Sequence, residues 1–136
     1  MPGVIPSELS RFEVRYGIGA AVMLAVEREA LGTDHGANGY TGIDEADLIG
    51  DRLALSSDTT LLDLGSGCGW PGLYLAHRFG CRLVSADPVA SGVARSVDRA
   101  RSDGLADRHL AVVADGADLP IRGASIDALV HVDVLC

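Results

Sequence analysis

The amino-acid sequence predicts an α/β fold in which helices flank a parallel sheet. Four short apolar runs between residues 60 and 132 are separated by stretches with helical patterning. Strands that are apolar on both faces are typical of parallel sheets covered by helices. In addition, 136 residues with 48% hydrophobic content can bury one core, so we expect a single domain over residues 1–136.

Residues 1–55 are expected to form an N-terminal helical cap region of that domain. Residues 16–31 are rich in alanine and leucine and precede a glycine, which predicts a helix with a glycine C-cap. The glycine-rich segment that follows, residues 32–42, predicts a loop. Asp44 is placed to N-cap a second helix that runs to about Leu55.

The rest of the chain alternates between two kinds of element. Short apolar runs predict strands, and the amphipathic stretches between them predict helices. The expected strands are residues 60–64, 82–86, 110–114 and 126–132, and helices are expected to begin at Pro71 and Val89. Each of the first two strands is thus followed by a helix, as the crossovers of a parallel sheet require.

The charge balance is acidic, with 19 acidic against 11 basic residues and a formal net charge of −8. Such a surface repels phosphate backbones, so nucleic acid is not expected as a partner. The apolar run at residues 17–26 is too short to span a membrane and follows no secretory leader, which predicts a cytoplasmic protein without a membrane partner. Three cysteines without C-x-x-C spacing indicate neither a disulfide framework nor a metal site.

The segment most informative about chemistry runs from Asp63 to Gly72, where a buried strand leads into a glycine-rich turn and then a helix. Glycines at alternate positions permit positive φ angles and leave no Cβ between the main chain and a ligand. Pro71 suits the first turn of the helix, whose unpaired N–H groups would face the bound molecule. Asp63 lies too many residues before Pro71 to cap that helix, which favours a role in binding.

Two classes of cofactor fit such a turn. Residues 67–72 satisfy the dinucleotide pattern G-x-G-x-x-G, which alone is a weak signal. A dinucleotide site usually places its first glycine directly after the strand, whereas here Gly65 and Ser66 intervene. Asp87, at the end of the next strand, could accept hydrogen bonds from the ribose hydroxyls of either cofactor.

The pattern Asp63-x-Gly65-x-Gly67-x-Gly69 resembles the first motif of class I (Rossmann-like) S-adenosylmethionine-dependent methyltransferases. In that family the acid and the glycine turn hold the methionine part of the cofactor. The resemblance covers residues 38–136 and therefore favours S-adenosyl-L-methionine over a dinucleotide.

Later segments agree with the same family in order and spacing. Asp87 follows the second strand, and Asp115 opens a segment similar to the family's third motif, which meets the adenine edge. Residues 125–133 resemble the family's fourth strand. The cofactor-binding residues that the resemblance implies are Asp63, Gly65, Ser66, Gly67, Gly69, Asp87, Pro88, Asp115, Gly116 and Ala117, together with Tyr40 and Thr41 from a segment similar to a cofactor-proximal loop of small-molecule members.

Some of these residues also have a purely structural interpretation. Asp115 could simply start an Asx-turn. His131 follows a strongly apolar strand, where a structural histidine is commoner than a general base, and Asp133 is open to the same interpretation. His131 and Asp133 are thus the only catalytic candidates, and the catalytic residues are left open.

The function that the resemblance implies is methyl transfer from S-adenosylmethionine to a small-molecule acceptor. The Asn/Asp-Pro-Pro-aromatic motif of many nucleic-acid amine methylases is missing at residues 131–134. Two alternatives stay open, a fragment of an NAD-dependent oxidoreductase and a non-catalytic module that binds a cofactor or pairs with a partner.

Family analogy also predicts a sheet order of third, second, first and fourth strand, with the C-terminal strands of the family fold missing. The chain is therefore expected to be a fragment with little activity alone. An open fourth strand, within residues 126–135, could pair with a second copy of the chain.

Overall fold

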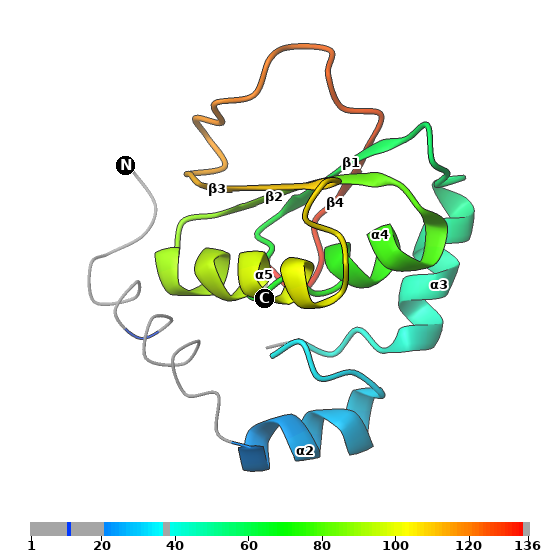
Figure 1. Cartoon of the computed structure of the whole chain (residues 1–136), viewed down its shortest axis with the longest axis vertical. Helices are drawn as coiled ribbons and strands as arrows, with labels where there is room; N and C mark the ends of the chain where they lie inside the picture. The colour runs from blue at the N-terminus through cyan, green and yellow to red at the C-terminus, as the bar shows by residue number, and fades with distance from the viewer. Residues whose placement is uncertain (1–10, 12–20, 37–38, 135–136) are drawn as a thin grey trace.

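The computed structural model describes residues 11, 21–36 and 39–134 and shows a four-stranded parallel sheet with helices packed against it (Figure 1). The strands are β1 (Thr60–Leu64), β2 (Arg82–Asp87), β3 (His109–Val113) and β4 (Ala128–Val130), and the helices are α2 (Ala21–Leu31), α3 (Ile43–Arg52), α4 (Gly72–Phe79) and α5 (Ala90–Ser102). The strand order is β3-β2-β1-β4, with all neighbours parallel. The predicted α/β class and strand order are confirmed.

The strand bounds follow the apolar runs, except at β4. β1, β2 and β3 lie within one residue of the predicted ranges, whereas β4 is shorter than the predicted 126–132. The backbone N–H of Asp127 donates to the Thr60 carbonyl, and the Asp127 carboxylate accepts from the Thr60 N–H. At the other end, the His131 ring rather than the backbone contacts the Leu64 carbonyl. A side-chain contact therefore accompanies the backbone bond before β4 and replaces backbone pairing after it.

The N-terminal helices agree with the sequence in kind but not at every boundary. α2 lies within the predicted range 16–31, of which residues 16–20 are outside the described part of the chain. Gly32 follows with φ 73°, and its N–H donates to the Arg28 carbonyl at 3.1 Å. This is the predicted glycine C-cap.

The N-cap of α3 is Gly42, so the prediction of Asp44 in that role is wrong. The carboxylate of Glu45 accepts the Gly42 N–H at 3.0 Å, as in a capping box. Asp44 lies in the first turn instead, where a negative charge is stabilised by the helix dipole. The helix ends at Arg52, before the expected Leu55, because the chain turns there through a left-handed residue, Ala54, at φ 51°.

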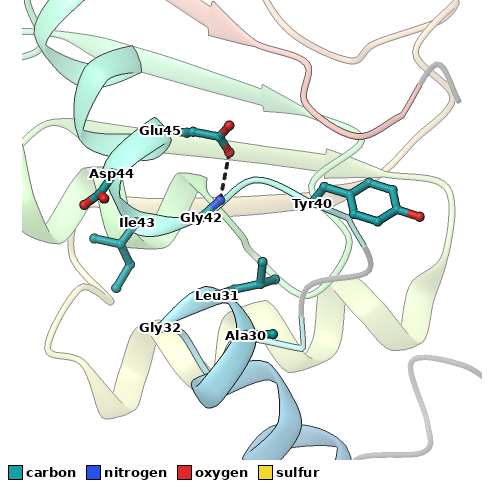
Figure 2. A pocket seen from close by; sticks show the side chains of 8 residues that line it. All are labelled: Ala30, Leu31, Gly32, Tyr40, Gly42, Ile43, Asp44 and Glu45. Atoms are coloured by element: carbon teal, nitrogen blue, oxygen red, sulfur yellow. Dashed lines mark hydrogen bonds between the residues drawn. The ribbon is translucent and has the colours of Figure 1, made fainter.

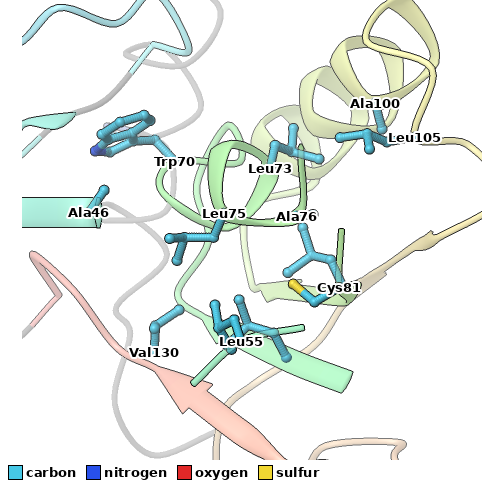
Figure 3. Close-up of a cluster of buried hydrophobic side chains, with 12 residues drawn as sticks. Ala46, Leu55, Trp70, Leu73, Leu75, Ala76, Cys81, Ala100, Leu105 and Val130 are labelled. Atoms are coloured by element: carbon cyan, nitrogen blue, oxygen red, sulfur yellow. The ribbon is translucent and has the colours of Figure 1, made fainter. Parts of the chain in front are cut away.

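The core lies between the sheet and the helices that cover one of its faces. α4 and α5 lie on one side of the sheet in Figure 1, while residues 114–127 form a loop on the other side. The core side chains, many of them drawn in Figure 3, are fully or almost fully buried: Ala46, Leu55, Leu61, Trp70, Leu73, Leu75, Ala76, Cys81, Leu83, Ala100, Leu105 and Val130. Each buried leucine stabilises the fold by about 1.5–3 kcal/mol, so this layer fixes where the strand ends lie.

The opposite face of the sheet carries an apolar row in register. Leu62 of β1 pairs with Val84 of β2 and Leu129 of β4, and Val84 pairs with Leu110 of β3. Leu62 is buried, but Leu110 and Leu129 are 72% and 50% exposed. Cover is therefore complete at Leu62, partial at Val84 and least at the two edge strands of the described chain.

No described helix is both long enough and apolar enough to cross a membrane.

Candidate functional site

The predicted site residues gather where the strands end. Asp63 lies in β1, Asp87 is the last residue of β2, and Asp115 comes two residues after β3. Parallel strands present their carboxyl ends at one edge of the sheet, and the register pairs Asp87 with Val113. This edge, with the glycine turn at residues 65–71, is the candidate site.

The glycine turn has the backbone shape that the sequence predicts. Gly65, Gly67 and Gly69 have φ angles of 76°, 52° and 107°, a region that side chains with a Cβ rarely enter. The N–H groups of Gly65 and Ser66 both donate to the Ala86 carbonyl, at 2.8 and 3.2 Å. The turn is therefore fastened to the end of β2.

Asp63 caps the helix after the turn, so the prediction that it lies too far away for this role is wrong. Its Oδ2 accepts the N–H of Gly72, the first residue of α4, at 3.0 Å. The turn folds back over β1, so the Asp63 carboxylate reaches the start of α4 although nine residues separate it from Gly72 in the sequence. The N–H groups of Gly72 and Leu73, which the sequence leads us to expect unpaired, are bonded within the protein, to Asp63 Oδ2 and to the Gly69 carbonyl.

Burial sets the charge of Asp63. The side chain is 1% exposed. Loss of solvation and, to a smaller extent, the nearby Asp87 raise its pKa to about 7 in all, against the lowering effect of the Gly72 hydrogen bond. Asp63 and Asp87 are thus close enough for their charges to interact, and Asp63 changes protonation near neutral pH.

Asp87 holds the turn to the next helix. One carboxylate oxygen accepts the Gly67 N–H at 2.8 Å and the other accepts the Val89 N–H at 2.9 Å. Burial raises the pKa of Asp87, and these two hydrogen bonds oppose the rise. A carboxylate offers about four acceptor positions, so Asp87 can still accept hydrogen bonds from two further donors. Pro88, between the two bonded positions, is half-buried.

The segment after β3 forms the Asx-turn that the sequence left open as an alternative. Asp115 Oδ1 accepts the Ala117 N–H at 3.0 Å. A Cβ added to Gly116 would lie 3.4 Å from Leu64 Cδ1, so this segment reaches across to the end of β1. The segment after β3 therefore lies beside the end of β1, and that the three aspartate side chains face one ligand stays a prediction.

Two serine hydroxyls at the site have no hydrogen-bond partner among the described residues. Both Ser66 Oγ, in the glycine turn, and Ser91 Oγ, in the first turn of α5, are buried. An unsatisfied buried hydroxyl destabilises a fold by about 1–3 kcal/mol unless a ligand or water pairs with it. Ser91 was not predicted as a site residue, and its place four residues after Asp87 is the signal that could have indicated it.

The predicted N-terminal pair separates in the structure. Thr41 is buried at the glycine turn, where its carbonyl accepts the Trp70 Nε1–H at 2.9 Å. The Tyr40 side chain is 88% exposed. Figure 2 shows Tyr40 beside a cavity of about 510 Å³ between α2 and α3, lined by Ala30, Leu31, Gly32, Tyr40, Gly42, Ile43, Asp44 and Glu45. Only Thr41 of the pair is joined to the turn.

The segment after β4 lies over the end of β1. The His131 Nδ1 donates to the Leu64 carbonyl at 2.8 Å, because a carbonyl can only accept. Asp133 Oδ2 accepts the Thr41 N–H at 3.2 Å. A Cβ on Gly65 would lie 2.6 Å from Val134 Cγ2, so the expected bare backbone of Gly65 is in contact with this segment. Both catalytic candidates therefore have structural contacts.

Within the described residues, no group of three or more His, Cys, Asp and Glu side chains could hold a metal ion.

Replacing Gly72 with alanine is expected to lower the free energy of unfolding by about 1–3 kcal/mol, as overpacking of a filled site does. The new Cβ would lie 2.5 Å from Asp63 Oδ2 and 2.9 Å from Asp63 Cβ, and Asp63 has no room to retreat. Gly123→Ala is the control, because no atom lies within 4 Å of its added Cβ. Urea unfolding of both variants measures the difference, and equal stabilities would contradict the packing described for Asp63.

Comparison with known proteins identifies the family. Residues 61–136 match the family model of the methyltransferase domain. The chain belongs to the methyltransferase domain family. The matched range includes the glycine turn and the ends of β1, β2 and β3, which places the candidate site inside the family's domain. The dinucleotide alternative gains no support from this match.

Related methyltransferases cover the same part of the chain. Methyltransferase GfsG of Streptomyces halstedii is 34% identical over 79 residues, which are 58% of this chain and 28% of that protein. The glycine/sarcosine/dimethylglycine N-methyltransferase of Actinopolyspora halophila is 32% identical over 80 residues, or 57% of this chain and 14% of that protein. The chain thus matches less than a third of the length of each of these relatives.

Solved structures agree with the fold. The geranyl diphosphate C-methyltransferase of Streptomyces coelicolor A3(2), in complex with Mg²⁺, geranyl diphosphate and S-adenosyl-L-homocysteine, has a TM-score of 0.60 and 26% identity, over 65% of this chain and 33% of that one. A putative sarcosine dimethylglycine methyltransferase from Galdieria sulphuraria has a TM-score of 0.63 at 21% identity, over 67% of this chain and 35% of that one, and supports the fold alone.

Proposed function

We propose that this chain is the cofactor-binding part of an S-adenosyl-L-methionine-dependent methyltransferase that acts on a small-molecule acceptor. The observation that carries the proposal is the edge of the sheet where Asp63, Asp87 and the glycine turn meet. Family membership supports it, and so does the S-adenosyl-L-homocysteine bound by the geranyl diphosphate C-methyltransferase.

The residues present fit such a cofactor. The hydroxyls of Ser66 and Ser91 are buried without a partner in the described chain, and Asp87 retains acceptor capacity. A ligand with hydroxyl and amino groups would satisfy these positions. The site is therefore built for a polar ligand, although its backbone donors are largely bonded within the protein.

Each part of the cofactor has a proposed set of contacts. The methionine part would lie at the glycine turn, the ribose at Asp87, and the adenine at the segment after β3. The proposed binding residues are Asp63, Gly65, Ser66, Gly67, Gly69, Asp87, Pro88, Asp115, Gly116, Ala117, Tyr40 and Thr41, to which the structure adds Ser91. Thr41 has direct contact with the turn, whereas Tyr40 is proposed to act from the exposed rim.

The bound cofactor supplies an electrophilic methyl group. The chain's own residues orient it and exclude water, which is the protein's main contribution to an in-line displacement. A base is needed only when the acceptor must lose a proton. His131 uses Nδ1 on the Leu64 carbonyl, so Nε2 is the ring nitrogen left for proton transfer, and we assign no catalytic base.

A small-molecule acceptor suits both the charge and the relatives. The net charge of −8 disfavours nucleic acid. One relative is a glycine/sarcosine/dimethylglycine N-methyltransferase and another is a geranyl diphosphate C-methyltransferase. A cytoplasmic location, one domain over residues 1–136 with 1–55 as a cap region, and self-association through β4 are proposed with it.

Calorimetric titration of the chain with S-adenosyl-L-homocysteine tests the proposal. Saturable binding of one equivalent is expected, with NAD binding more weakly or not at all. Binding is the better readout than turnover, because the relatives are several times longer than the matched region. Tighter binding of NAD, or no heat with S-adenosyl-L-homocysteine at high protein concentration, would overturn the proposal.

A further inference from the structure

The loop at residues 39–42, called here the Thr41 loop, is held on both sides of one residue. The Thr41 carbonyl accepts the Trp70 Nε1–H at 2.9 Å, and the Thr41 N–H donates to Asp133 Oδ2 at 3.2 Å. Trp70 belongs to the glycine turn, whereas Asp133 comes after β4 and is 92 residues away in sequence. Three separate parts of the chain therefore meet at Thr41.

Two unusual backbone features make this contact feasible. Asp133 has a φ of 56°, a left-handed conformation that few residues other than glycine adopt. On the other side, a Cβ added to Gly39 would lie 2.1 Å from both Asp133 Cγ and Oδ2. Because only glycine leaves room for this carboxylate, the loop and Asp133 fit each other closely.

The contact lies at one end of the candidate site. Asp133 is followed by Val134, whose Cγ2 would be 2.6 Å from a Cβ on Gly65. Two residues before Asp133, the His131 ring donates to the Leu64 carbonyl at the end of β1. Residues 131–134 thus lie against Gly65 at the start of the glycine turn, next to the place where the proposed function puts the methionine part of the cofactor.

We propose that Asp133 is a positioning residue, whose carboxylate holds the Thr41 loop against the glycine turn and thereby raises the affinity for the amino-acid part of the cofactor. This inference rests on the proposed function. Asp133 acts through the Thr41 backbone, which assigns it a role other than the general base considered from the sequence. The proposed ribose and adenine contacts come instead from Asp87 and the segment after β3, at neighbouring strands.

The test compares two ligands that differ only in the amino-acid part. The affinity of the wild-type chain and of Asp133→Ala is measured by calorimetry for S-adenosyl-L-homocysteine and for 5′-methylthioadenosine. We expect Asp133→Ala to lower the affinity for S-adenosyl-L-homocysteine about tenfold or more. The reason is that the Thr41 loop loses the hydrogen bond to a charged group that holds it in place. Binding of 5′-methylthioadenosine should change less than about twofold, because the adenosine contacts are unaltered.

Three further variants separate positioning from general damage. Asp133→Asn keeps an oxygen acceptor and tolerates positive φ, so it should restore most of the affinity. Gly39→Ala disturbs the contact between the Thr41 loop and Asp133 from the side of the loop. It should lower the affinity for S-adenosyl-L-homocysteine and leave that for 5′-methylthioadenosine unchanged. Asp98→Ala, at a side chain that is 77% exposed on α5, should bind both ligands as the wild type does. Thermal unfolding of each variant confirms that it is folded.

The outcomes are distinct. Selective loss in Asp133→Ala and Gly39→Ala, with recovery in Asp133→Asn, supports the proposal. Wild-type affinity in Asp133→Ala, or an equal loss for both ligands, overturns it while the proposed function stands. If Asp133→Ala fails to fold, Gly39→Ala decides on the same criteria. If the wild-type chain binds neither ligand, the proposed function fails and this inference fails with it.

Discussion

Asp87→Ala is expected to weaken binding of S-adenosyl-L-homocysteine at least about a hundredfold, because each hydrogen bond to a charged group contributes about 1.5–3 kcal/mol and a ribose offers two hydroxyls. The variant also leaves the N–H groups of Gly67 and Val89 without their acceptor. Loss of these two hydrogen bonds should lower the free energy of unfolding by about 1–3 kcal/mol for each N–H donor that stays buried. Calorimetric titration and urea unfolding measure the two effects.

Two further variants help to interpret the affinity and stability of Asp87→Ala. Asp87→Asn keeps one oxygen acceptor, so its affinity and stability should fall between those of the wild type and Asp87→Ala. Asp107→Ala, at an exposed position, should leave both quantities unchanged. Undiminished affinity in a folded Asp87→Ala would show that the ribose is not bound at the end of β2.

Asp63→Asn is expected to gain stability relative to the wild type as the pH rises from 5 to 8. The pKa of Asp63 is 3.8 ordinarily and about 7 in the fold, mainly because burial disfavours the charged form. Between these values the native state binds a proton that the unfolded state has lost. The stability that this proton provides is full below pH 3.8 and is lost as the pH rises through about 7.

The size of this effect follows from the two pKa values. The gap between 3.8 and about 7 corresponds to roughly 4 kcal/mol, an upper figure for the difference between the two proteins above pH 8. Asparagine carries no charge to desolvate and can still accept the Gly72 N–H. Urea unfolding of both proteins at several pH values measures the difference. Parallel stability curves would show that the Asp63 carboxyl keeps an ordinary pKa.

Sequence patterns predicted the elements whose cause is local. The apolar runs gave β1 and β2 nearly to the residue, because a central parallel strand must be apolar on both faces. β4 was predicted too long, because apolar side chains continue beyond the three residues that pair with β1. Periodicity detects burial and not pairing, and the Asp127 and His131 side chains bond to β1 at the two ends of this strand.

The site was predictable in location but not in its connections. Glycines after a buried strand indicated the turn, since their φ angles are a local requirement. The cap that Asp63 provides to α4 spans nine residues, and the bond from Thr41 to Asp133 spans 92. Neither follows from a spacing rule, because both depend on how separate elements pack. The Ser91 hydroxyl follows Asp87 by four residues in the sequence, but its burial without a described partner is visible only in the structure.

The glycine turn is held in place by hydrogen bonds within the protein. Its amides at Gly65, Ser66 and Gly67 are bonded to the end of β2, and the donor of Gly72 is bonded to the Asp63 carboxylate. The binding of a ligand at this site therefore does not have to order the main chain of the turn, which is preorganised. Less of the interaction energy would then be spent on ordering the protein. Substitutions that break the hydrogen bonds of the turn would weaken ligand binding even where they remove no ligand contact.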